Sequence, residues 1–202
     1  MMEKLKPVYV LALIAAIISG LIIVVYNLTY VDTTNILTDK QAAAVTAIYG
    51  GTKDDYEIVP LVIKNENNEN VPTEIGKKLT DAGLDIAKVI RKKSDGSLAF
   101  ECLVKGYKKG FDIMVGVKDG VVAGVAIVSV GEETPGLGTN TNDPKFLDNF
   151  KGISNKATIV KTAPSAAGEV QAVTSATFSS KGVANAVNIA LEAFKTVGGE
   201  AQ

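Results

Sequence analysis

The chain has 202 residues, no histidine, no tryptophan and one cysteine, and its formal net charge at pH 7 is -1. Without histidine it cannot form a Ser-His-Asp or Cys-His catalytic pair, a histidine-ligated haem or a mixed Cys/His zinc site. Cys102 alone cannot close an internal disulfide or ligate an iron-sulfur cluster. The nearly balanced charge gives no indication of a nucleic-acid surface.

A long uncharged stretch near the beginning of the chain predicts a membrane-spanning helix. No charged residue occurs from Pro7 to Val31, and residues 8–26 read VYVLALIAAIISGLIIVVY. As a helix, this segment is about 28 Å long, close to the thickness of the hydrocarbon core. It lacks the polar stripe of a soluble helix, and no A-x-A cleavage site follows Tyr26. We therefore expect an uncleaved anchor rather than a buried helix or a signal peptide.

Charges on either side of this stretch predict its orientation. Lys4 and Lys6 precede it, whereas Asp32 and Asp39 follow it with only Lys40 nearby. Because basic residues flank membrane helices on the cytoplasmic side, we expect a cytoplasmic N-terminus. The remainder of the chain then lies on the extracytoplasmic face of the cell membrane, held by a single-pass anchor in contact with lipid.

The rest of the chain begins with predicted helices. Thr38-Asp39 is typical of a cap before an alanine-rich helix that ends at Gly50-Gly51. The polar run at residues 65–70 (NENNEN) predicts a solvated loop, and a short helix is expected at residues 74–82.

A change to period-two alternation then predicts an antiparallel meander. Asp95-Gly96 and Asp119-Gly120 are strong hairpin turns between apolar runs. Cys102 falls within one run and is expected to be a small buried residue. The four strands are expected at residues 87–92, 97–105, 111–117 and 121–130.

Short elements and a final helix follow the meander. We expect a short helix around residues 146–150, strands at 157–161 and near 170–173, and a last helix whose apolar face includes Val183, Val187 and Leu191. The predicted fold class is α+β: a single N-terminal transmembrane helix followed by an antiparallel-sheet domain with flanking helices. The expected boundaries are 1–31 for the N-terminus and anchor, 32–86 for a helical linker region and 87–202 for the core.

Two segments could carry chemistry. Residues 174–180 (TSATFSS) stand immediately before the last helix, where hydroxyl residues either cap the helix or let an anion approach its N-terminus. Residues 132–138 (EETPGLG) have the composition of a turn. The adjacent carboxylates Glu132 and Glu133 are expected to point apart, and since no third ligand is evident, we predict no metal site.

The order of membrane span, meander, ETPGLG and TSATFSS resembles the FMN-binding family that includes the G subunit of the Rnf electron-transport complex. In that family FMN is linked through its phosphate to the last threonine of a Ser/Thr-Gly-Ala-Thr motif, which corresponds to Thr177. The chain departs from the family at Ser175, where glycine is usual, and at Gln171, where aspartate commonly begins the motif. The second change is expected to weaken recognition by the flavin transferase. The resemblance implies that Glu133, Thr134, Leu137 and Gly138 line the flavin, with Thr174, Ser175 and Ala176 beside the phosphate.

The resemblance also implies a function. The chain would be an electron-carrying flavoprotein subunit of an ion-translocating ferredoxin:NAD+ oxidoreductase, with no catalytic residue and no independent activity of its own. Its partners would be the FMN-bearing D subunit, the A and E membrane subunits, and the flavin transferase. A phosphate-linked FMN needs neither histidine nor a reactive cysteine, which suits this composition. Two alternatives stay open: the related but usually longer C subunit of the sodium-pumping NADH:quinone oxidoreductase, and a non-redox anchored binding or scaffold module.

Overall fold

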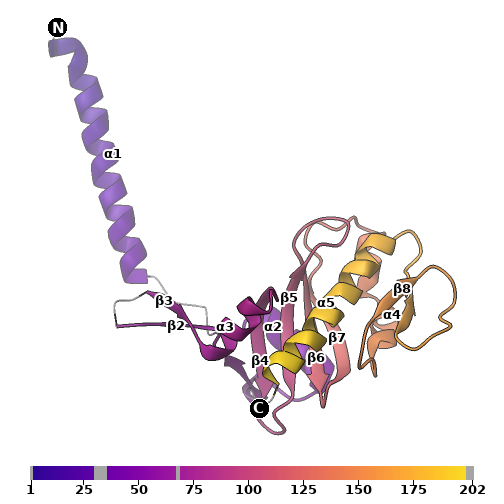
Figure 1. Ribbon diagram of the computed structural model, residues 1–202. Coiled ribbons are helices and arrows are strands. Elements are labelled where there is room, and N and C mark those ends of the chain that lie inside the picture. The colour runs from indigo at the N-terminus through magenta and orange to yellow at the C-terminus, as the bar shows by residue number, and fades with distance from the viewer. Residues whose placement is uncertain (1, 30–35, 67–68, 199–202) are drawn as a thin grey trace. The chain divides into compact units, whose positions relative to one another are not determined.

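The computed structural model describes residues 2–29, 36–66 and 69–198 (Figure 1). The chain divides into two units, Met1–Ile36 and Leu37–Gln202. The expected end of the anchor at residue 31 lies outside the described residues. The five-stranded sheet of the second unit contains strands from both sides of the boundary expected after residue 86 between the linker region and the core.

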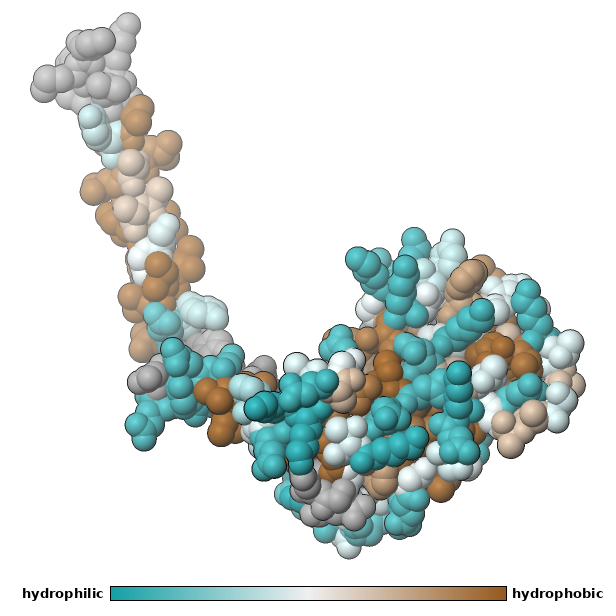
Figure 2. Space-filling view, viewed as in Figure 1, coloured by the Kyte–Doolittle hydropathy of each residue, from teal (hydrophilic) through white to brown (hydrophobic). Residues whose placement is uncertain are grey.

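The first unit contains helix α1, Met2–Thr29. Its segment Val8–Thr29 has a mean hydropathy of 3.0 and is the one described helix long and apolar enough to cross a membrane. Figure 2 shows hydrophobic residues along most of the visible face of this segment. Leu11 and Leu28 expose 69% and 81% of their surface. These properties match the expected membrane anchor.

The second unit is built on an antiparallel sheet of five strands in the order β1-β4-β5-β6-β7. The meander predicted from alternation is confirmed as its last four strands. Asp119 and Gly120 have φ of 52° and 75°, the positive values that a tight hairpin turn requires between the last two strands. The strands are β1 Tyr56–Val59, β4 Ile86–Lys92, β5 Leu98–Val104, β6 Phe111–Lys118 and β7 Val121–Ser129.

A helix covers each face of this sheet (Figure 1). Helix α5, Thr177–Val197, packs on the face that includes Phe100 and Ile113, and α2, Asp39–Tyr49, packs on the face that includes Met114. Cys102 lies on the α5 face and is completely buried, as expected. Burial raises the pKa of its thiol far above the usual range, so Cys102 acts as a small apolar core residue.

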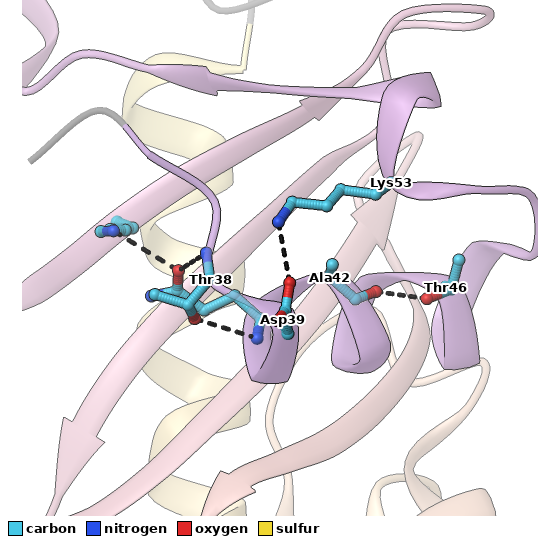
Figure 3. A network of polar contacts seen from close by, with 7 residues as sticks. Thr38, Asp39, Ala42, Thr46 and Lys53 are labelled. Atoms are coloured by element: carbon cyan, nitrogen blue, oxygen red, sulfur yellow. Dashed lines mark hydrogen bonds and ion pairs between the residues drawn. The ribbon is translucent and has the colours of Figure 1, made fainter. Parts of the chain in front are cut away.

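The start of α2 carries the predicted cap (Figure 3). The Gln41 backbone N–H donates to the Thr38 hydroxyl at 3.3 Å, and the Gln41 side chain accepts from the Thr38 backbone N–H at 3.0 Å. Lys53 forms an ion pair with Asp39 at 2.9 Å, which adds a contact at the same helix end. The helix ends at Tyr49, and Gly50, which follows it as the C-cap, has φ of 74°.

The remaining elements are short, and some differ from expectation. The polar run 65–70, expected as a loop, connects a hairpin, with residues 67 and 68 outside the described residues. The strand expected near 170–173 ends at Gln171, because the Val173 N–H instead donates to the Ser180 hydroxyl at 3.0 Å. These elements are η1 Lys53–Asp55, β2 Val62–Lys64, β3 Asn70–Pro72, α3 Glu74–Asp81, η2 Gly138–Asn142, α4 Pro144–Leu147, η3 Asp148–Phe150, β8 Thr158–Val160 and β9 Glu169–Gln171, with β8 and β9 parallel.

Candidate functional site

A cavity of about 350 Å³ lies at the N-terminus of α5. Three segments far apart in the sequence form it: the loop between β5 and β6, the turn after β7, and the residues that begin α5. The structure brings together all the predicted site residues except Thr174, which lines a neighbouring cavity with Thr139 and Asn140. The lining residues are Tyr107, Glu133, Thr134, Leu137, Gly138, Ser175, Ala176, Thr177, Phe178 and Ser179.

The last four residues of the TSATFSS segment, 177–180, form the beginning of α5. The helix was expected to follow this segment, but it starts at Thr177, because the Ser180 N–H already donates to the Ala176 carbonyl at 2.9 Å. Ser175, at the family's glycine position, has φ of 63° in the left-handed region. That conformation turns the chain into the helix and explains why a glycine suits this position.

The hydroxyl groups here do not act as an ordinary helix cap. Ala176 occupies the cap position and provides no side-chain hydrogen bond. Among the described residues, nothing accepts from the backbone N–H groups of Thr177, Phe178 and Ser179, and nothing bonds to the Thr177 hydroxyl. Free donors at a helix N-terminus with a free hydroxyl beside them form a place where an anion such as a phosphate can be held.

Glu133, in the turn after β7, is hydrogen-bonded to both of the other segments that form the cavity. Its side chain is buried, and its carboxylate accepts hydrogen bonds from the Ser179 hydroxyl at 2.7 Å and from the Lys108 backbone N–H at 2.9 Å. A Cβ at Gly106 or Gly138 would overlap its oxygens, so both positions need glycine for this close approach. Glu132 is exposed, as expected for neighbours that point apart. Glu133 therefore positions the walls of the cavity, with its two oxygens directed at protein groups.

Exposed apolar side chains surround the start of α5. Tyr107, Leu137 and Phe178 expose 58%, 44% and 66% of their surface. The ring centroids of Tyr107 and Phe178 are 6.4 Å apart, and the Lys108 ammonium lies 5.7 Å from the Tyr107 centroid. Such rings next to an anion-binding helix end suit a ligand that is planar and aromatic at one end and anionic at the other.

Sequence reasoning missed three residues of the cavity. Phe178 could have been found, because one large aromatic residue stands out in a run of small hydroxyl residues. Ser179 belongs to the hydroxyl run, but the sequence does not indicate its contact with Glu133, since this 2.7 Å hydrogen bond joins positions 46 residues apart. No pattern pointed to Tyr107, which lies in a loop of lysines and glycines. No group of three or more His, Cys, Asp or Glu residues is placed to hold a metal ion within the described ranges.

Residues 106–192 match the family model of the FMN-binding domain. This range contains every residue that lines the cavity, and the residues present fit FMN through the helix N-terminus, the free hydroxyl and the exposed rings. This part of the chain is therefore similar to FMN-binding domains, and the resemblance stated from the sequence is confirmed at that level.

Two curated relatives are the G subunits of one kind of complex. The chain is 28% identical over 151 residues, 71% of its length and 69% of the relative's, to the G subunit of the Na(+)-translocating ferredoxin:NAD(+) oxidoreductase complex of Acetobacterium woodii. It is 38% identical over 96 residues to the proton-translocating counterpart of Clostridium ljungdahlii, covering 47% of this chain and about half, 51%, of that relative.

A solved structure shares the fold. The crystal structure of the C subunit of the Na(+)-translocating NADH-quinone reductase from Parabacteroides distasonis aligns with a TM-score of 0.51 and 20% identity. The alignment covers 81% of this chain and 93% of that one. This likeness supports the α+β fold predicted from the sequence.

Proposed function

We propose that the chain is an electron-carrying flavoprotein subunit of a membrane-bound ion-translocating ferredoxin:NAD+ oxidoreductase. The observation that carries the proposal is the free Thr177 hydroxyl at the uncapped N-terminus of α5, inside an FMN-binding domain. Both curated relatives are G subunits of ferredoxin:NAD+ oxidoreductase complexes, which supports this complex over the quinone-reducing one.

In this proposal the chain holds FMN covalently through a phosphodiester to the Thr177 oxygen. The free N–H groups at the start of α5 and the positive end of its dipole stabilise the phosphate charge. Tyr107, Leu137 and Phe178 supply apolar contact for the flavin ring. Bound FMN provides the electron-transfer chemistry, and the protein supplies its position and electrostatic surroundings.

The other lining residues shape the site without chemistry of their own. Gly138, Ser175 and Ala176 are small, which lets a phosphate approach the backbone at the helix start. Thr134 lines the cavity from the turn, where its carbonyl accepts from the Leu137 N–H at 3.1 Å. Thr174 lies outside the cavity lining, so its place beside the phosphate rests on its position in the motif alone.

The membrane-spanning helix fixes this carrier to the cell membrane. We propose a single-pass topology with the N-terminus in the cytoplasm and the FMN-binding domain on the extracytoplasmic face. The partners are then other subunits of the complex, especially the FMN-bearing D subunit and the A and E membrane subunits, with a flavin transferase for maturation. Fixing a carrier to the membrane raises its effective concentration near membrane partners.

A denaturing gel viewed under ultraviolet light tests the covalent link. The full chain, expressed in a host with the flavin transferase, should give a fluorescent band that Thr177→Ala abolishes. Thr196→Ala is the matched control, because it removes an exposed hydroxyl at the other end of the same helix. A dark wild-type band at normal expression contradicts the covalent link, and a native protein without any FMN contradicts the proposed function.

A further inference from the structure

A second cavity, of about 430 Å³, runs along the outer edge of β7. We call it the β7 groove. It is lined by residues 124–128 of β7, by Ala43, Ala44, Ala47 and Ile48 of α2, by Pro144 and Leu147 of α4, and by the polar residues Lys40, Asn142, Asp148 and Lys151. Side chains alternate between the two faces of a strand, so five consecutive lining residues mean that the groove faces the strand's edge. The groove is separate from the proposed flavin site, because the two cavities share no lining residue.

The backbone of β7 is paired on its outer side only at the start of the strand. The Val122 N–H donates to the Ile153 carbonyl, and the Gly152 N–H donates to the Val122 carbonyl, both at 2.9 Å. From Ala123 to Ser129, the described part of the chain gives the strand no backbone partner other than β6. The outward N–H and C=O groups along the groove are thus available for another strand.

Sequence features that normally protect a free edge are missing here. No charged residue and no proline occurs from Val121 to Gly131. The side chains from Ala126 to Val130 are all half-buried, so apolar surface remains on both sides of the open edge. Register shifts beside β7 fall between Val122 and Gly124 and between Ile127 and Ser129, so the strand is regular from Gly124 to Ile127. Natural proteins block exposed edges with charge, proline or a bulge, and the regular stretch Gly124–Ile127 has none of these, so this apolar edge points to a partner that covers it.

The shape, the free backbone groups and the charges of the groove restrict which partner can bind there. An extended strand can satisfy the outward backbone groups of β7, whereas a helix satisfies its own and cannot. If β7 of a second copy paired with this edge, α2 and α4 of that copy would meet α2 and α4 of the first. The β7 strand of a second copy therefore could not reach the groove. Lys40 is exposed at the rim, and Lys151 there is already paired with Asp148 at 2.8 Å, which favours an acidic residue beside Lys40.

We propose that the β7 groove is a docking site for an extended, mainly apolar segment of another protein, which adds to the sheet as a sixth strand and carries one acidic residue next to Lys40. Main-chain hydrogen bonds to β7 would provide affinity. The small residues Ala43 and Ala47 would leave room for every second side chain of the added strand. This inference rests on the proposed function in one respect, because it takes the partner to be another subunit of the same membrane complex.

Hydrogen exchange compares the full chain alone in detergent with the full chain in the complex purified from native membranes. We expect alternate amides between Gly124 and Ser129 to exchange at least ~10-fold more slowly in the complex. Amides of the exposed hairpin β2–β3 serve as the control and should be unchanged. Equal exchange of the β7 amides in both samples overturns the proposal, and so does protection that grows with the concentration of the chain alone, since that would mean a second copy.

Charge at the groove provides the second test. Ala126→Lys and Val128→Lys should each lower the fraction of tagged chain recovered with the complex at least ~10-fold, equivalent to about 1.4 kcal/mol. Ile63→Lys is the matched control, because it adds the same charge to a half-exposed apolar strand residue elsewhere. Flavin fluorescence of each variant reports whether it folds. Wild-type recovery of both groove variants overturns the docking site, whereas a wild-type chain that purifies without partners overturns the proposed function and the docking site with it.

Discussion

At the scale of single residues, Glu133 offers the clearest link between burial and the shape of the proposed flavin site. Glu133→Gln keeps the side-chain volume, but the amide has one acceptor oxygen where the carboxylate receives two donors. The Ser179 hydroxyl must then turn to accept from the amide NH2, and both hydrogen bonds to the charged carboxylate are lost, so we expect the free energy of unfolding to fall by about 1–3 kcal/mol. Urea unfolding measures this loss, and lower fluorescence anisotropy of the flavin would report looser walls.

The exposed neighbour is the control for that prediction. Glu132→Gln makes the same chemical change outside the network and should alter the free energy of unfolding by no more than about 0.5 kcal/mol. Equal effects of the two substitutions would contradict the positioning role of Glu133.

Ser175 is the other residue whose backbone decides an expected outcome. A left-handed conformation costs a non-glycine residue about 1–2 kcal/mol, and replacing it with glycine removes this cost. Glycine also increases the entropy of the unfolded chain, which lowers the free energy of unfolding by about 0.5–1 kcal/mol. We therefore expect Ser175→Gly to raise the free energy of unfolding by about 0.5–1 kcal/mol, measured by urea unfolding. Ser154→Gly, at an exposed position with negative φ, should lower it. A loss of stability in both variants would show that Ser175 is not strained.

At the scale of elements, a carboxyl pair lies where α2 packs on the sheet. Glu101 of β5 is buried and receives hydrogen bonds from the Gln41 amide at 2.8 Å to each oxygen. Burial and then the Glu101 charge raise the pKa of Asp112 on β6 to about 7. The folded protein therefore holds a proton that the unfolded chain releases near pH 4. As the pH rises from about 4 to about 7, the free energy of unfolding should fall, and it should level off above about 7.

Asp112→Asn isolates this effect. The amide cannot ionise, so the fall in stability between pH 5 and pH 8 should become smaller, and the variant should be more stable than the wild type at pH 8. Urea unfolding at the two pH values measures the difference. Asp54→Asn, on an exposed side chain of η1, should keep the wild-type slope. An unchanged slope in Asp112→Asn would assign the pH dependence to other groups.

The elements also show how far the sequence could be read. The meander could be predicted because period-two alternation and two Asp-Gly turns are local features. Strand β1, Tyr56–Val59, could not be predicted, because four residues are too few to show a clear alternation. These residues form a strand only by pairing with β4. The turn and the helix start of the site were recognised by composition and resemblance. Tyr107 was not, since its place beside Phe178 depends on how the β5–β6 loop meets α5.

At the scale of the whole molecule, most of the sequence's apolar excess belongs to one segment. The helix Val8–Thr29 gains very roughly 4–7 kcal/mol on insertion from its leucine, isoleucine and valine residues. The second unit has its own core on both faces of the sheet. A carrier built this way can fold as a unit while one helix holds it at the membrane, so its working position depends on which way that helix inserts.

Protease added outside intact cells or spheroplasts tests the direction of insertion. Because Lys4 and Lys6 precede the apolar stretch, the second unit should lie outside and be digested, with loss of the full-length band and of the flavin fluorescence proposed for it. A cytoplasmic protein followed in the same sample should stay intact until the cells are lysed. Replacing Lys4 and Lys6 with glutamine should lower the digested fraction, since it removes the charges that retain the N-terminus. Complete protection of the wild-type domain before lysis, with digestion after it, would mean the opposite orientation.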